Sequence, residues 1–118
     1  MTDSRKILLV EDEYLIRMLL EDMLDDLGYD VAATAGSLPE ASELARSQDF
    51  DAAILDVNLD GKEVYPVADI VAARGLPFVF VTGYGGGGLP TQYRSRPTLQ
   101  KPFQIDELNK TLSAVLAR

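Results

Sequence analysis

Short apolar runs and apolar stripes of helical spacing alternate along the chain, and this alternation restricts the possible folds more than any other feature. Continuous apolar runs, typical of strands that are covered on both faces, lie at residues 6–10, 52–55 and 77–81. Apolar residues recur every three or four positions between and after them, which predicts helices near residues 15–27, 38–45, 64–71 and 105–115. We therefore expect an α/β fold with a parallel sheet, helices on both faces and right-handed crossovers.

The first helical stripe is the longest one. Such a stripe faces the core in an amphipathic helix, and here it ends at Gly28, a natural C-cap. Its members are Leu15, Ile16, Leu19, Leu20, Met23, Leu24 and Leu27.

Weaker signals complete the order of elements. Residues 29–34 and 97–100 are predicted strands, and Asp60-Gly61 predicts a turn after the third strand. Five of the nine glycines lie within residues 83–88, where a helix would not be stable, so a loop is expected there instead. The length of 118 residues suits one domain, residues 1–118.

Composition excludes several classes of function. The chain has no cysteine and no histidine, which excludes disulfides, thiolate catalysis, histidine-based triads and imidazole metal ligands. A metal would need oxygen ligands, which favours Mg²⁺ or Ca²⁺. The net charge of −8 argues against nucleic-acid binding. With no signal peptide or apolar span in the sequence, we expect a cytoplasmic protein without membrane contact.

Polar residues follow the predicted strands at one edge of the sheet, where ligands bind in open parallel sheets. Taken singly, each has an ordinary explanation, such as helix-dipole compensation for Glu13 or a solvated turn for Asp56. Taken together they favour a site. The residues are Glu11, Asp12 and Glu13 after the first strand, Asp56 after the third, Thr82 after the fourth and Lys101 after the fifth.

This set has a chemical meaning. Two carboxylates about 5 Å apart repel each other by on the order of 3 kcal/mol, so three in one crevice require a cation. Oxygens of Glu11, Asp12 and Asp56 suit Mg²⁺. A bound Mg²⁺, a Lys ammonium and a Thr hydroxyl can together stabilise a transferring phosphoryl group, and a carboxylate can accept that group as an acyl phosphate.

Four segments carry a resemblance to a known family. They are Val10-Glu11-Asp12-Glu13, Leu55-Asp56-Val57-Asn58, Thr82-Gly83 and Lys101-Pro102-Phe103. In this order they resemble the response-regulator receiver domain. The resemblance implies a flavodoxin-like, CheY-like sheet of five parallel strands in the order 2-1-3-4-5.

The resemblance also implies roles for single residues. Asp56 corresponds to the phospho-acceptor, Asp12 to a direct Mg²⁺ ligand, and Glu11 to a ligand acting through water. Asn58 corresponds to the residue that offers its backbone carbonyl to the metal, and Thr82 to the switch hydroxyl. Lys101 corresponds to the phosphate-binding lysine, and Pro102 to a proline that follows a cis peptide bond.

The chain also departs from ordinary receivers. Thr98 stands where they carry an aromatic switch residue, and Gly83-Tyr84-Gly85-Gly86-Gly87-Gly88 replaces their fourth helix. Phe80-Val81-Thr82-Gly83-Tyr84 resembles the single-domain FATGUY receivers of alphaproteobacteria, some of which act in phosphorelays of the general stress response. We predict a shortened or loop-like fourth helix, with Tyr84 and its glycine loop taking over the switch role.

The sequence thus predicts a phosphorylation-controlled switch rather than an enzyme. A sensor histidine kinase or a histidine phosphotransfer protein would phosphorylate Asp56 with Mg²⁺, and a monomer would signal by protein–protein contacts, with some autodephosphorylation. Two alternatives stay open: a pseudo-receiver scaffold that works without phosphorylation, and a receiver fragment of a larger hybrid kinase or regulator.

Overall fold

A five-stranded parallel sheet forms the centre of the computed structural model, which describes residues 5–83 and 89–117. The strands follow the order β2-β1-β3-β6-β7, so the predicted order 2-1-3-4-5 is confirmed. Their bounds are β1 (Lys6–Val10), β2 (Asp30–Ala35), β3 (Ala52–Asp56), β6 (Phe78–Thr82) and β7 (Thr98–Gln100).

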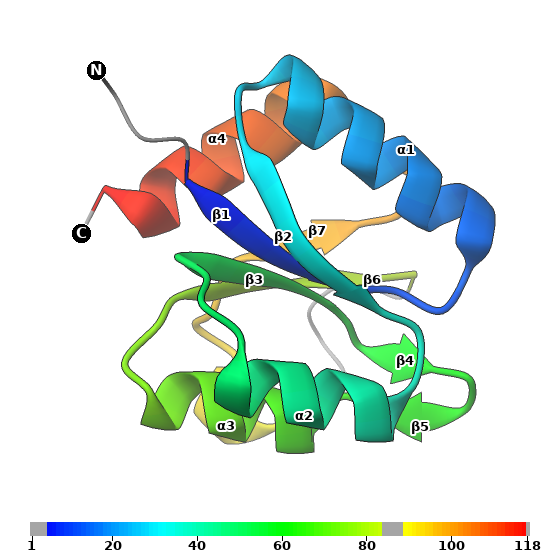
Figure 1. Cartoon of the computed structure of the whole chain (residues 1–118), viewed down its shortest axis with the longest axis vertical. Coiled ribbons are helices and arrows are strands. Elements are labelled where there is room, and N and C mark those ends of the chain that lie inside the picture. Colours follow the sequence, from blue (N-terminus) through cyan, green and yellow to red (C-terminus); the bar gives the residue numbers. More distant parts are fainter. Residues whose placement is uncertain (1–4, 84–88, 118) are drawn as a thin grey trace.

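Helices cover both faces of this sheet (Figure 1). On one face lie α1 (Tyr14–Asp26) and α4 (Ile105–Leu116), and on the other α2 (Leu38–Ser47) and α3 (Tyr65–Ala73). Local sequence sets where α2 begins: Ser37 Oγ accepts a hydrogen bond from the N–H of Glu40 at 3.4 Å. Pro66 lies in the first turn of α3, where its missing N–H costs no helical hydrogen bond.

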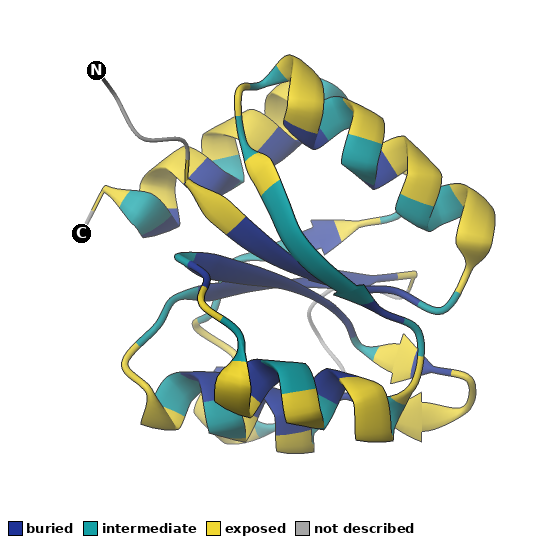
Figure 2. Cartoon of the chain, in the orientation of Figure 1, coloured by how far each residue is buried: buried dark blue, intermediate teal, exposed yellow. Residues whose placement is uncertain are grey.

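Two hydrophobic clusters, one on each face, hold the layers together. Successive side chains of a strand point to opposite faces, so Leu8 and Phe80 pack toward α2 and α3, while Ile7 and Val79 pack toward α1 and α4. In each cluster, buried residues of the covering helices pack against the buried side chains of the sheet (Figure 2). The continuous apolar runs of the sequence are therefore explained by burial on both faces.

The predicted stripe of α1 is only partly buried. Leu20 and Leu24 are fully buried, but Leu15 is 76% exposed and Leu19 is 46% exposed, which contradicts the expectation that both face the core. The apolar residues of α1 span a wider arc than one sheet face can cover, because they occupy two adjacent rows. Leu15 and Leu19 belong to the outer row.

A small hairpin that the sequence analysis described only as a turn follows β3. Strands β4 (Asn58–Leu59) and β5 (Lys62–Glu63) pair antiparallel. Both turn residues have left-handed backbone, with φ of 50° at Asp60 and 85° at Gly61. Glycine adopts this conformation without strain, and Asp-Gly is a favoured pair in such two-residue turns.

Between β6 and β7 the described residues form one short 3-10 turn, η2 (Thr91–Tyr93), and no α-helix. This agrees with the predicted loop-like fourth helix, although Tyr84 and the rest of 84–88 lie outside the described residues. The buried Tyr93 stacks on Tyr65 at a centroid distance of 6.0 Å and contacts Phe78 and Phe80 edge-on. Its hydroxyl donates a hydrogen bond to Asp69 of α3.

Across the described ranges, no helix is long and apolar enough to cross a membrane.

Candidate functional site

The sheet brings the predicted site residues to the carboxyl ends of its strands. Glu11 follows β1, Asp56 and Thr82 are the last residues of β3 and β6, and Lys101 follows β7. The N–H of Lys101 donates to the carbonyl oxygen of Thr82 at 2.8 Å, which joins the ends of the two neighbouring strands. The peptide bond from Lys101 to Pro102 is cis, the isomer that the resemblance implies.

Three carboxylates meet at this edge. One oxygen each of Glu11, Asp12 and Asp56 lies within 4.8 Å of the other two. Glu11 is 0% exposed and Asp56 is 4% exposed, whereas Asp12 is only half-buried. Backbone N–H groups orient the two buried ones: Glu13 donates to Oε1 of Glu11 at 3.1 Å, and Asn58 donates to Oδ1 of Asp56 at 3.2 Å.

Lys101 is the cation of the cluster. Its Nζ lies 3.3 Å from Oδ2 of Asp56, 3.4 Å from Oε2 of Glu11 and 3.3 Å from Oε1 of Glu13. Burial lowers the pKa of this ammonium, but the charges of Asp56 and Glu11 outweigh burial and hold the pKa above its usual value. Lys101 therefore stays charged near Asp56.

Glu11 carries the clearest sign that the cluster lacks positive charge. Burial raises the pKa of Glu11 to about 8, and a hydrogen bond with Asp56 and the charge of that carboxylate add to the rise. Its Oε2 is fully buried and accepts no well-oriented hydrogen bond, with Lys101 Nζ as an ion-pair contact only. A cation bound beside Oε2 would give this buried oxygen a partner and would favour the charged form of Glu11.

The donor set fits Mg²⁺. The three carboxylates supply hard oxygen ligands without nitrogen or sulfur, which is the chemistry that Mg²⁺ prefers. The side-chain Oδ1 of Asn58 accepts from the N–H of Gly61 at 2.7 Å, so the side chain serves the hairpin turn rather than the cluster.

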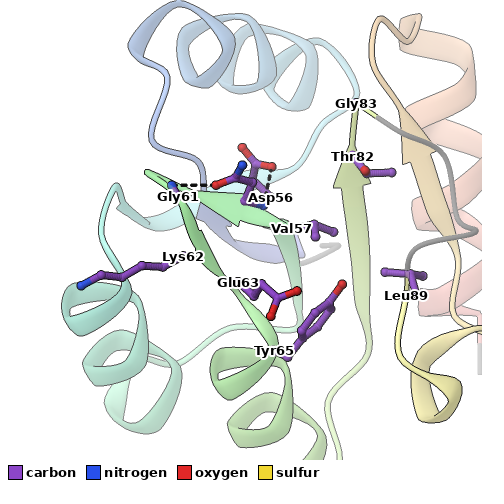
Figure 3. A pocket seen from close by; sticks show the side chains of 10 residues that line it. Asp56, Val57, Gly61, Lys62, Glu63, Tyr65, Thr82, Gly83 and Leu89 are labelled. Atoms are coloured by element: carbon purple, nitrogen blue, oxygen red, sulfur yellow. Dashed lines mark hydrogen bonds between the residues drawn. The ribbon is translucent and has the colours of Figure 1, made fainter.

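Two hollows adjoin Asp56. An acidic cleft of about 340 Å³ is lined by Asp12, Glu13, Asp56, Asn58, Asp60, Gly61, Gly83 and Lys101. A more apolar cavity of about 240 Å³ shares Asp56 and part of the hairpin with this cleft and includes Tyr65, Thr82 and Leu89 in its lining. In Figure 3, Lys62 extends away from Asp56, while Tyr65 lies between the hairpin and β6. Thr82 is 5% exposed, close to the acceptor position.

The structure thus brings together Glu11, Asp12, Asp56, Thr82 and Lys101, while the predicted role of Tyr84 falls outside the described residues. Sequence reasoning missed two contacts. Glu13, explained there by the helix dipole, shares Lys101 with Asp56. The N–H of Asp60 donates to Oδ2 of Asp12 at 2.9 Å. In the sequence, only the Asp60-Gly61 turn signal pointed to this part of the chain.

Comparison with known proteins agrees with this geometry. The sequence profile of the response regulator receiver domain matches residues 7–113. The chain belongs to the response regulator receiver family. Receiver domains are signalling switches of two-component systems rather than conventional enzymes, and they bind Mg²⁺ in their active site.

Individual relatives support this assignment. SdrG from Sphingomonas melonis Fr1 superposes with a TM-score of 0.87 at 44% identity, covering 98% of this chain and 99% of SdrG. A receiver domain of the sensor histidine kinase PA1611 from Pseudomonas aeruginosa PAO1, described with magnesium in its active-site cleft, has a TM-score of 0.85 and 27% identity, with coverage of 98% and 100%. The transcriptional regulatory protein PdtaR of Mycobacterium tuberculosis is 33% identical over 97% of this chain, which spans 58% of PdtaR.

Proposed function

We propose that this receiver accepts a phosphoryl group from a phosphohistidine onto the carboxylate of Asp56. The observation that carries the proposal is the setting of Asp56, a buried carboxylate 3.3 Å from a lysine ammonium and within 4.8 Å of two further carboxylates. A structural aspartate would not need this surplus of negative charge. An acceptor of a phosphoryl group does, because the cluster attracts the cation that the transfer uses.

The transfer is an in-line exchange of one bond for another. An Asp56 oxygen forms the new O–P bond while the N–P bond of the phosphohistidine breaks, and the departing nitrogen keeps the bonding electron pair. Lys101 offsets the negative charge on the phosphoryl oxygens. Glu11, Asp12, Asp56 and the backbone carbonyl of Asn58 would hold Mg²⁺, which, when bound, supplies further positive charge at the same place.

The donor would dock on the exposed face of α1. We define the α1 patch as Tyr14, Leu15, Met18 and Leu19, which are 63%, 76%, 42% and 46% exposed. An apolar groove of about 290 Å³, lined by Ile16, Leu19, Lys101, Pro102 and Phe103, joins this patch to the site. A histidine kinase domain or phosphotransfer protein seated there would bring its phosphohistidine to the edge at which Asp56 lies.

The output would be a change of shape read by a protein partner. Thr82, buried at the end of β6, would move toward the phosphoryl oxygens, and the switch role proposed for Tyr84 stays a prediction. Slow autodephosphorylation would reset the domain. The FATGUY-like segment favours a role in the general stress response, and the cytoplasmic location and monomeric state are proposed on sequence grounds alone.

The test uses acetyl phosphate as a small donor, with and without Mg²⁺, and intact-mass measurement of the product. Wild type should gain one phosphoryl group only with Mg²⁺, and Asp56→Ala should gain none. Asp22→Asn, which removes an exposed carboxylate from α1, is the control and should behave like wild type. Label without metal, or label in Asp56→Ala, would contradict the proposal.

A pseudo-receiver scaffold is the competing function. It predicts no phosphoryl uptake by the wild type and partner binding that Asp56→Ala leaves unchanged. The buried cluster around Asp56 favours the phosphorylated switch.

A further inference from the structure

The β4–β5 hairpin contacts the proposed cation site at its base, where the N–H of Asn58 donates to Asp56, and again at its tip. The N–H of Asp60, at the tip of the hairpin, donates to Oδ2 of Asp12 at 2.9 Å. The two residues are 48 positions apart in sequence. Asp12 lies in the loop after β1, and the hairpin follows β3. This contact therefore joins two separate parts of the site (Figure 1).

Asp12 needs such a contact more than its two neighbours do. Glu11 and Asp56 are buried and both lie within ion-pair distance of Lys101. Asp12 is half-buried and, within the described residues, has no ion pair. Repulsion from the other two carboxylates would therefore turn the Asp12 side chain toward solvent unless something holds it.

The hairpin tip is built to present that N–H. Asp60 and Gly61 both have positive φ, and Oδ1 of Asn58 accepts from the N–H of Gly61 at 2.7 Å. The N–H of Val64 donates to the carbonyl of Val57 at 2.9 Å and closes the base of the hairpin. These hydrogen bonds fix the direction in which the Asp60 N–H points.

We infer that the β4–β5 hairpin is a positioning element for the cation: its Asp60 N–H holds Asp12 as a ligand, and the cation in turn stabilises the hairpin. The inference rests on the proposed function, because it assumes cation binding by Glu11, Asp12 and Asp56. Coupling between two sites is reciprocal by thermodynamic necessity. If the ordered hairpin strengthens cation binding, the bound cation must therefore stabilise the ordered hairpin to the same extent.

A matched pair of glycines separates this role from general stability. Gly61 and Gly28 both have φ of 85°, and an added Cβ would meet nothing within 4 Å at either position. Gly61→Ala and Gly28→Ala therefore carry the same backbone strain, one in the hairpin and the other beyond α1. Asn58→Ala is a second hairpin variant, which removes the acceptor for the Gly61 N–H but keeps the backbone carbonyl.

The experiment is titration of each protein with MgCl₂, followed by NMR shifts, together with amide hydrogen exchange of Leu59, Asp60 and Lys62. We expect Gly61→Ala and Asn58→Ala to weaken Mg²⁺ binding by about tenfold, since a hydrogen bond to a charged group is lost or distorted. Gly28→Ala should bind like wild type while melting at a temperature similar to that of Gly61→Ala. Mg²⁺ should slow exchange at the hairpin amides of the wild type.

The outcomes separate the two levels of the argument. A wild type that binds no Mg²⁺ overturns the proposed function and this inference with it. A wild type that binds Mg²⁺, with unchanged or tighter binding in both hairpin variants, overturns only the inference. Weakened binding in Gly28→Ala as well would assign the effect to stability and would likewise contradict the positioning role.

Discussion

Replacing Asp12 by Asn should stabilise the cation-free protein and should remove most of the stabilisation that Mg²⁺ gives to the wild type. The Asp12 carboxylate lies within 4.8 Å of Asp56 at their nearest oxygens, and at an effective dielectric constant of 20 this is about 3 kcal/mol of repulsion. Asp12 is half-buried, so solvent reduces the figure to about 1–2 kcal/mol. An Asn carbonyl still accepts from the Asp60 N–H, which leaves that hydrogen bond in place.

With Mg²⁺ the order of stabilities should reverse. At a concentration 100 times its dissociation constant, a ligand adds about 2.7 kcal/mol to the free energy of unfolding, more than the repulsion that Asp12→Asn relieves. The measurement is urea unfolding followed by far-ultraviolet circular dichroism, in EDTA and in saturating MgCl₂. Asp22→Asn makes the same charge change at an exposed position of α1 and should show no reversal. If Asp12→Asn is not more stable than wild type in EDTA, the argument from repulsion in the cluster is wrong.

Three further predictions concern signalling, docking and pH. Thr82→Ala should still accept a phosphoryl group, since the acceptor and the cation ligands remain, but NMR shifts on phosphorylation should no longer spread beyond β6; a full response would remove Thr82 from the mechanism. Leu15→Ser should slow phosphotransfer from a donor protein by about tenfold, while the free energy of unfolding changes by less than about 0.5 kcal/mol because Leu15 is 76% exposed; an equal loss with acetyl phosphate would argue against docking. Burial and the hydrogen bond to Asp69 raise the pKa of Tyr93, so the folded state keeps this proton longer and loses stability as pH rises above about 10. Tyr93→Phe should flatten that alkaline loss in urea titrations, and an unchanged slope would refute this reading.

The fold was predictable because each central strand is apolar on both faces. In β6 every residue from Phe78 to Val81 is buried, and the polar residue that ends the strand, Thr82, lies at the edge where the site forms. Asp56 and Thr82 could be placed for this reason alone, whereas Lys101 follows the weaker strand signal at residues 97–100. Their roles came from the resemblance, since strand ends in many proteins carry such residues without a site.

The rest depended on information that periodicity does not contain. The spacing of Leu15 and Leu19 is equally suited to a buried row and to an exposed row beside it, and only the width of the sheet face decides between them. The hairpin has two residues in each strand, too few for a visible alternation. The ion pair of Glu13 with Lys101 joins residues 88 positions apart, so no local pattern could indicate it.

The aromatic cluster gives this molecule an optical signal of its own. The chain has five tyrosines and no tryptophan, and Tyr65 stacks on Tyr93 with an angle of 21° between the rings. Tyr65 also lines the cavity that Asp56 and Thr82 share. Rings held in fixed, asymmetric packing produce near-ultraviolet circular dichroism, which is lost when that packing loosens. A rearrangement that starts at Asp56 and reaches Tyr65 would change this band, so the switch can be followed in unlabelled wild-type protein, without isotopes or an added fluorophore.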